Sequence, residues 1–262
     1  MSLPQKDTHD LEALFALNGL KNLDNFKIKA TLSRAKRTAE ALLQTEPAEG
    51  YHHLALIHAF SNNYDVSIDN FKKALRLQSN DAGLWANYSI TLIDAGHILD
   101  SLNAHLKALE LNPFNAKLFT RLNHFSNWYL YLDYQEKSFE AYKGKIDEKI
   151  DQPISLQTSQ YFLDFLDKKN IKVETFRKQL VLANHVCNQF YQTNRLHLLA
   201  EANPEDGYLS RVLYLKDSSP QEVVRLNSLY EEEILKWLEQ QEDGGFSLAN
   251  ELDDLILYFS VA

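Results

Sequence analysis

Histidine and cysteine are the side chains here that would most readily bind a metal ion or act as nucleophiles. Nine histidines occur in 262 residues, and the densest group is His52, His53 and His58. His53 and His58 are five residues apart and would not share a helix face, so packing or surface roles are expected for them. The single cysteine, Cys187, has no CxxC partner and follows Val186, which predicts a buried, unreactive thiol. We therefore expect no metal site.

Motifs that catalyse or hold cofactors are missing from the sequence. It contains no HExxH, GxxxxGK[ST], GxGxxG or GxSxG. The acidic run Glu231-Glu232-Glu233 is typical of a solvated helix face. We expect no catalytic residue, no cofactor and no enzymatic activity. An unrecognised enzyme in the C-terminal part stays as the third alternative. Such an enzyme would need a pocket lined by titratable groups, and His197 is the only histidine in residues 193–262.

A 34-residue period organises the first half of the chain. Residues 48–81 and 82–115 align so that large apolar and small residues recur at the same positions. Equivalent pairs are Tyr51 and Trp85, Leu54 and Tyr88, Ala55 and Ser89, Ser67 and Ser101, and Ala74 and Ala108. A period in the thirties with fixed large and small positions is typical of stacked helix pairs.

Each window predicts two helices, at 48–61 with 64–78 and at 82–95 with 98–112. Two helices approach closely only where a side chain is small, which explains the recurring alanines and serines. Asn62-Asn63 and Gly96 suit the turns inside the pairs, and Pro113 stops the last helix.

The second window resembles the tetratricopeptide repeat family in its large Trp85, small Ser89, turn residue Gly96 and closing Pro113. The first window keeps Tyr51, Leu54, Ala55, Ser67, Phe71 and Ala74 but has Ser79 in place of the proline. In the second window, His105 stands where the family usually has an aromatic residue. The resemblance covers about residues 48–115 and implies a mainly α fold, a superhelix of antiparallel helix pairs.

Further helices must flank these repeats, because at least three repeats generally make a stable stack. Lys27–Gln44 looks like the second helix of a degenerate repeat, and Ala116–Tyr129 like the first helix of another. Residues 132–192 predict about three more helices, with breaks at Pro153 and Lys168–Asn170. We expect one helical domain over residues 1–192.

Residues 193–262 predict a second, small α+β domain of order β-β-α-β. Leu196–Ala202 and Tyr208–Lys216 resemble strands around the turn Pro204–Gly207. Ser219-Pro220-Gln221-Glu222 is a capping box that starts a helix. Gly244-Gly245 ends that region, and Leu255–Val261 is expected to be the closing strand.

Charge is distributed unevenly along the chain. Residues 1–130 hold 13 basic and 13 acidic residues, whereas residues 196–262 hold 4 and 14, a net charge of −10. The negative electrostatic field of this region favours basic partners and repels nucleic acid. The alternative is that the acidic residues only keep a small domain soluble. No apolar stretch is long enough for a bilayer, and no basic-then-apolar leader follows Met1, so we expect a soluble, cytoplasmic protein with no membrane partner.

Tetratricopeptide repeats bind ligands along the concave surface of their first helices, and the resemblance implies such a groove here. Its implied lining is His52, Leu56, Phe60, Asn87, Ile90, Asp94, Lys117, Arg121, His124 and Trp128.

Part of that lining resembles the carboxylate clamp with which some family members hold the C-terminal tail of heat-shock chaperones. Asn87, Lys117 and Arg121 match three of its five positions, while His52 and Leu56 replace the other two. An ammonium and a guanidinium one helical turn apart would grip a terminal carboxylate together. A groove for another peptide, or one packed on the C-terminal domain, stays as the alternative.

The sequence thus favours a protein-interaction module, with the acidic C-terminal domain as a second contact. The first alternative is an immunity protein or antitoxin-type inhibitor, whose acidic end would cover the basic site of a nuclease-like partner.

Overall fold

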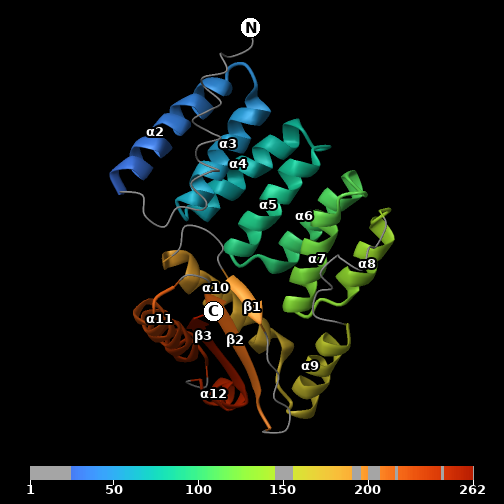
Figure 1. The fold of residues 1–262 in the computed structure, drawn as a ribbon, viewed down its shortest axis with the longest axis vertical. Helices are drawn as coiled ribbons and strands as arrows, with labels where there is room; N and C mark the ends of the chain where they lie inside the picture. The colour runs from blue at the N-terminus through green and yellow to red at the C-terminus, as the bar shows by residue number, and fades with distance from the viewer. Residues whose placement is uncertain are drawn as a thin grey trace. The chain divides into compact units, whose positions relative to one another are not determined.

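Helices make up most of the protein in the computed structural model, which describes residues 25–144, 156–190, 196–199, 207–215, 218–242 and 245–261 (Figure 1). The chain separates into two compact units, Met1–Leu118 with Ala141–Gly144 and Phe119–Glu140 with Lys145–Ala262. This grouping places the later helices with the strands. The expected boundary between domains at residues 192 and 193 stays a prediction.

The first unit consists of consecutive helices, and from α2 to α6 each helix packs on the next along the chain. They are α2 (Asn25–Leu42), α3 (Pro47–Phe60), α4 (Tyr64–Leu77), α5 (Ala82–Asp94), α6 (Ile98–Leu111) and the beginning of α7 (Ala116–Trp128). The helices expected at 48–61, 64–78, 82–95 and 98–112 are confirmed to within one residue at each end. The flanking helices expected at Lys27–Gln44 and Ala116–Tyr129 are confirmed as α2 and α7.

The 34-residue period is repeated in the contacts of the two helix pairs. The Ser67 hydroxyl donates a hydrogen bond of 2.7 Å to the carbonyl of Ala55. The Ser101 hydroxyl donates one of 2.6 Å to the carbonyl of Ser89, 34 positions further along for both partners. All four residues are fully buried. The recurring small residues therefore let the helices approach and also link them.

The turns inside the pairs repeat in the same way. In each, one residue has a positive φ and the next N–H bonds back to the carbonyl five residues earlier, which is the Schellman ending of a helix. The residues with positive φ are Asn62 (57°), Gly96 (83°), Leu130 (55°) and Asn170 (55°). The back-bonds are Asn63 to His58 (2.9 Å), His97 to Leu92 (2.8 Å), Tyr131 to Ser126 (2.7 Å) and Ile171 to Leu166 (2.8 Å). The first three turns are 34 residues apart, so α7 and α8 (Asp133–Ala141) form a third pair with the same turn.

Apolar packing holds the first unit together. Phe71, Ala74 and Leu92 form a buried cluster with Ala55, and half-buried Tyr51 packs against it. A second cluster joins α2 to α3. Gly50 is buried at that crossing, where an added Cβ would lie 2.8 Å from the backbone nitrogen of Leu43. The interior of α3 thus needs a glycine because α2 passes so closely.

The second unit contains the rest of α7, further helices and a small sheet. The further helices are α8, α9 (Leu156–Lys168), α10 (Val173–Phe190), α11 (Pro220–Glu239) and α12 (Phe246–Asp253). Arg177 of α10 caps the end of α7, because its guanidinium donates to the carbonyls of Tyr129 (2.8 Å) and Leu130 (3.0 Å) and lies 3.7 Å from the Tyr131 ring centroid.

The sheet has three strands in the order β1-β2-β3. β1 (Leu196–Leu199) pairs antiparallel with β2 (Leu209–Leu215), and β2 pairs parallel with β3 (Leu255–Val261). The two strands of the predicted hairpin are confirmed as β1 and β2, and the closing strand as β3. Residues 200–202, 204–206 and 216 of the predicted hairpin lie outside the described residues. The parallel pairing requires a crossover, which α11 and α12 supply.

α12 was not expected from the sequence, where Gly244-Gly245 marked the end of a region. Gly245 has φ +83° and immediately precedes α12. The glycine pair therefore leads into a further helix and does not end the helical region. The capping box at Ser219 and Glu222 is confirmed at the start of α11.

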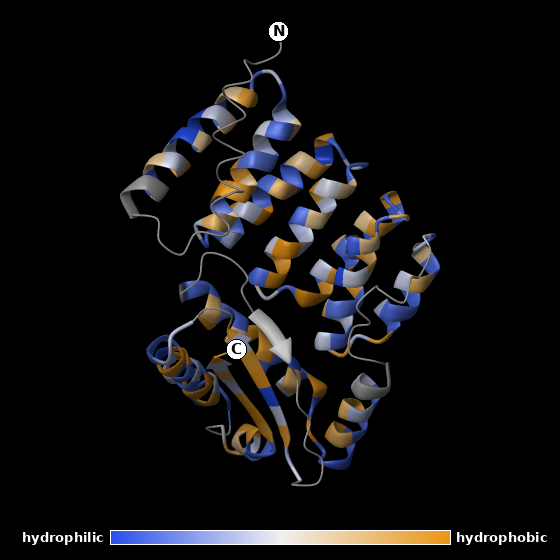
Figure 2. Cartoon of the chain, in the orientation of Figure 1, coloured by the Kyte–Doolittle hydropathy of each residue, from blue (hydrophilic) through white to orange (hydrophobic). Residues whose placement is uncertain are grey.

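One face of the sheet is apolar and helix-covered. Leu209, Leu213, Leu215 and Phe259 on this face are at most 1% exposed, and Figure 2 shows apolar residues gathered along β2 and β3. Arg211 lies on the same face of β2, between Leu209 and Leu213. No helix among the described residues has the length and apolar character to span a bilayer.

Candidate interaction surface

The first helices α3 and α5 lie close enough for side chains on their exposed sides to meet. The Asn87 amide donates to Nε2 of His52, with 3.1 Å between the nitrogens. Both residues are half-buried, so they are accessible and yet fixed by each other. Of the predicted groove residues, these two are brought together directly.

Glu49 completes a polar cluster at this end of α3. Its carboxylate lies 3.3 Å from Nε2 of His53 and 3.9 Å from Nδ1 of His52. The neighbouring His52 ring is the main cause that lowers the pKa of Glu49, and His53 adds to the effect, so the carboxylate stays ionised. Burial lowers the pKa of His53 despite the nearby carboxylate, which favours the neutral ring. The surface therefore presents one negative charge beside two stacked imidazoles.

The remaining predicted residues of α3 and α5 are half-buried: Leu56, Phe60, Ile90 and Asp94. Leu56 packs against the apolar cluster of the first unit. These side chains combine apolar area with solvent access, as a protein-binding surface requires.

Lys117 and Arg121 of α7 are exposed, as the clamp requires. Neither side-chain cation donates a hydrogen bond to any described residue, so both are free to bind an anion. Their spacing of four places them one turn apart on α7. The three clamp residues belong to different compact units: Asn87 and Lys117 lie in the first unit and Arg121 in the second. The three-residue clamp stays a prediction.

His124 and Trp128 form an edge-to-face pair on α7, with ring centroids 5.1 Å apart. Both are half-buried, and the indole N–H of Trp128 is buried with no partner among the described residues. The pair gives α7 an aromatic surface next in sequence to Arg121.

The histidine, cysteine, serine and acidic side chains of the described ranges form no accessible catalytic or metal-binding arrangement. No three His, Cys, Asp or Glu side chains there are arranged to hold a metal ion. The Ser89 hydroxyl lies 2.7 Å from Nδ1 of His105, but both residues are 0% exposed, so no substrate reaches them. Cys187 is buried on α10, as its sequence context predicted.

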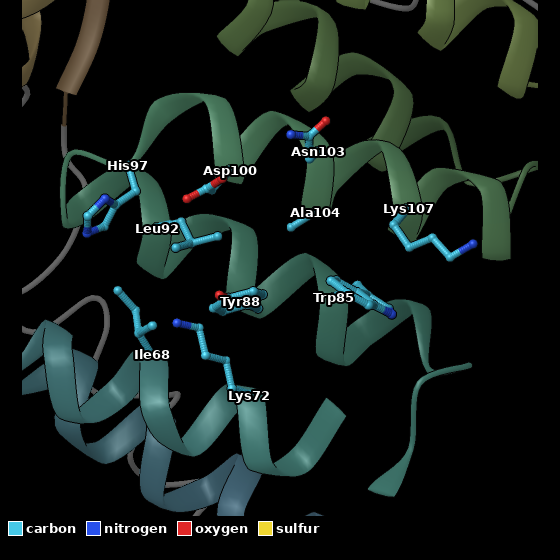
Figure 3. Close-up of a pocket in the computed structure, with 10 residues that line it drawn as sticks. All are labelled: Ile68, Lys72, Trp85, Tyr88, Leu92, His97, Asp100, Asn103, Ala104 and Lys107. Atoms are coloured by element: carbon cyan, nitrogen blue, oxygen red, sulfur yellow. The ribbon is translucent and has the colours of Figure 1, made fainter. Parts of the chain in front are cut away.

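A hollow of about 560 Å³ opens between α4, α5 and α6 in the first unit. Figure 3 shows its lining: Ile68, Lys72, Trp85, Tyr88, Leu92, His97, Asp100, Asn103, Ala104 and Lys107. None of these residues belongs to the predicted groove. Sequence reasoning missed them because it considered ligand contacts from the first helices alone. The exposed charges on α4 and α6 were the available signal.

Comparisons with known proteins add little to this geometry. No family model matches the chain, and no curated protein matches it. A solved structure of a mutant O-GlcNAc transferase from Thermobaculum terrenum is similar over 48% of this chain and 24% of that chain, with 20% identity and a TM-score of 0.35. The chain thus spans a small part of the transferase, and neither fold nor function is transferred from it.

Proposed function

We propose that this protein is a non-enzymatic protein-interaction module built from tetratricopeptide-like helix pairs. It binds a peptide or partner protein on the first helices, with His52 and Asn87 fixed for contact and the cations of α7 available for a carboxylate. The step from a repeat fold to partner binding is an analogy of architecture, and it does not name the partner. The partner is therefore described only by the chemical groups that these side chains would bind.

The recurrence of the same contacts at 34 residues carries this proposal. The serine hydrogen bonds and the Schellman turns give the pairs α3/α4 and α5/α6 the same internal geometry, and their first helices α3 and α5 keep accessible side chains. Stacked helix pairs form extended surfaces that bind partners. The half-buried polar and aromatic residues of α3 and α5 supply the contacts.

A double substitution tests the carboxylate contact. Lys117→Ala with Arg121→Ala is expected to weaken binding of a captured partner about 10- to 100-fold, because charge-assisted hydrogen bonds are lost. The free energy of unfolding is expected to change by less than about 0.5 kcal/mol, since both side chains are exposed.

Lys36→Ala with Arg37→Ala on α2 is the matched control, because it removes the same two charges from exposed positions. Partners are captured with the full-length protein, identified by mass spectrometry, and their affinities measured for each variant. Equal affinities for the two double variants would contradict a groove that uses Lys117 and Arg121.

A second candidate function is inhibition of a basic, nuclease-like protein by the acidic C-terminal region. Glu231, Glu232 and Glu239 are exposed on α11, together with Val224 (66%) and Leu235 (58%). Glu231→Gln with Glu232→Gln is expected to weaken such a complex and reduce its salt dependence. A partner that binds on the first helices alone is expected to be unaffected by these substitutions.

A further inference from the structure

The hollow between α4, α5 and α6 combines an apolar floor with charged rims of opposite sign. Trp85, Tyr88 and Leu92 of α5 form the floor, Lys72 stands on the α4 rim, and Asp100 on the α6 rim (Figure 3). A volume of about 560 Å³ lies within the range of pockets that bind ligands.

This hollow uses a different side of α5 from the proposed groove. Asn87 contacts His52 of α3, whereas its neighbour Tyr88 lines the hollow with α4 and α6. Adjacent helix residues point about 100° apart, so one helix serves both surfaces. A ligand in the hollow and a partner on the first helices therefore contact different side chains.

The side chains of Lys72, Asp100 and Tyr88 line the hollow without a hydrogen bond or ion pair to a described residue. The Lys72 ammonium and the Asp100 carboxylate are both exposed, but neither forms an ion pair or a hydrogen bond with a described residue. The Tyr88 hydroxyl also lacks a described partner, although Tyr88 is only 9% exposed. Burial raises the pKa of Tyr88, with Asp100 and Asp69 adding to the effect, so its hydroxyl stays protonated and can donate.

Lys107, in contrast, already lies 3.2 Å from Glu110. The unpaired cation is thus on the α4 rim and the unpaired anion on the α6 rim. A ligand that neutralises both must carry an acidic group toward α4 and a basic group toward α6, with an apolar group between them.

The spacing of the rims fits an extended peptide. Packed helices lie roughly 8–10 Å apart, so two rims separated by α5 are roughly 10–15 Å apart. In an extended chain, side chains at alternate positions point to one face, and positions i and i+4 are about 13 Å apart. Three alternate side chains therefore span the hollow from rim to rim.

We propose that this hollow binds an extended segment of a partner protein that carries a basic, a large apolar and an acidic side chain at alternate positions. The apolar side chain packs on Trp85 and Leu92, the acidic one pairs with Lys72, and the basic one pairs with Asp100. This binding is additional to the proposed function on the first helices and does not depend on it.

Synthetic peptides test the proposal on the full-length protein. The probes are the acetylated and amidated peptides Arg-Ser-Phe-Ser-Glu, Gln-Ser-Phe-Ser-Gln and Arg-Ser-Gly-Ser-Glu, titrated into isotope-labelled protein and followed by nuclear magnetic resonance. The first peptide is expected to bind with a sub-millimolar Kd and to shift signals of α4, α5 and α6. The other two are expected to bind about fivefold more weakly or not at all.

Protein variants identify the charges that contribute. Lys72→Glu is expected to weaken the first peptide about fivefold and to leave the neutral peptide unchanged. Lys73→Glu is the matched control on α4, because the Lys73 ammonium lies over Tyr51, 5.4 Å from its ring centroid, and does not line the hollow. Lys72→Glu combined with Asp100→Lys is expected to restore binding, since an extended peptide can lie in either direction.

Three results would overturn the proposal. They are no saturable binding of the first peptide, equal affinity for the neutral peptide, and unchanged affinity of the Lys72→Glu variant. Circular dichroism of each variant separates these outcomes from misfolding. The charge-swapped double variant is a second test, because it is expected to restore binding and misfolding would not.

Discussion

Arg211 is the largest side chain that is fully buried in the described protein, and no carboxylate accompanies it. Its guanidinium donates to the carbonyl of Phe176 (3.3 Å) and to the side-chain oxygen of Gln179, and it lies 3.9 Å from the Phe176 ring centroid. Burial lowers its pKa to about 10, which leaves it charged at neutral pH. Planar stacking and two hydrogen bonds thus replace an ion pair between β2 and α10.

Arg211→Lys is expected to destabilise the protein by about 2–3 kcal/mol, because an ammonium cannot stack and reach both acceptors. Chemical denaturation measures the change. Arg225→Lys on the exposed side of α11 is the matched control and is expected to change stability by less than about 0.5 kcal/mol. Equal effects at the two positions would show that the buried geometry contributes nothing.

The histidines of α3 predict acid sensitivity in the first unit. Burial lowers the pKa of His53 in the folded protein below its usual value of about 6.5, so the unfolded chain binds the proton more readily. Stability is therefore full above about pH 6.5 and falls as the pH decreases through that value. The lowered pKa of Glu49 adds a further loss below its usual value of about 4.5.

His53→Gln is expected to reduce the loss of stability between about pH 7 and pH 5.5. Part of the loss remains in this variant, because burial and Lys36 also lower the pKa of His58. Urea denaturation at the two pH values measures the difference. The same decrease in both proteins would mean that His53 does not contribute.

At the scale of elements, the Schellman turns end the first helix of each pair and reverse the chain into the second helix. Asn62 and Gly96 were predictable as turn residues because asparagine and glycine tolerate positive φ. Leu130 was not, since a leucine gives no turn signal. It has a positive φ and is buried, with 3% exposure. The third pair was therefore recognised only by its first helix.

Substitutions at Asn170 test these turns. Asn170 is exposed and has φ +55°, so Asn170→Ala is expected to cost about 1 kcal/mol, whereas Asn170→Gly is expected to be neutral or slightly stabilising. Thermal unfolding of both variants measures this. A glycine variant that loses as much stability as the alanine variant would contradict the turn assignment.

Gly50→Ala tests the close crossing of α2 and α3. Alanine usually stabilises a helix relative to glycine by about 1 kcal/mol. Here the added Cβ would lie 2.8 Å from the backbone nitrogen of Leu43 and 3.0 Å from the carbonyl of Ala39, so a loss of about 1–3 kcal/mol is expected. Gly83→Ala is the control in the first turn of α5, where an added Cβ would meet only the Asp81 side chain at 3.2 Å. Stabilisation by Gly50→Ala would show that α2 does not pack closely on α3.

The elements themselves were largely predictable. Periodic apolar residues predicted the helices of the first half. The capping box predicted the start of α11, and the strand-like run Leu255–Val261 predicted β3. α12 was missed because the glycine pair preceding it indicated an end and its eight residues give only a short amphipathic pattern. The parallel pairing of β2 and β3 joins residues some 46 positions apart, as in Leu209 and Leu255, and no local signal encodes such a pairing.

At the scale of the whole molecule, the sequence located one candidate surface and missed the other. The repeat register placed His52 and Asn87 on neighbouring first helices, and their hydrogen bond agrees with that placement. The hollow depends on side chains of α4, α5 and α6 together. The repeat register implies that these helices are neighbours, but it does not indicate a hollow between them. The acidic end of the chain, with its net charge of −10, remains the separate basis for a basic partner.

Hydrogen–deuterium exchange of the full-length protein, alone and with its captured partner, tests the central proposal most directly. Binding on the first helices predicts slower exchange at the amides of α3, α5 and α7 when the partner is present. The same amides are expected to show no added protection in the Lys117→Ala and Arg121→Ala double variant at an equal partner concentration. Protection confined to α11, α12 and β3 would contradict the proposal and assign binding to the acidic region.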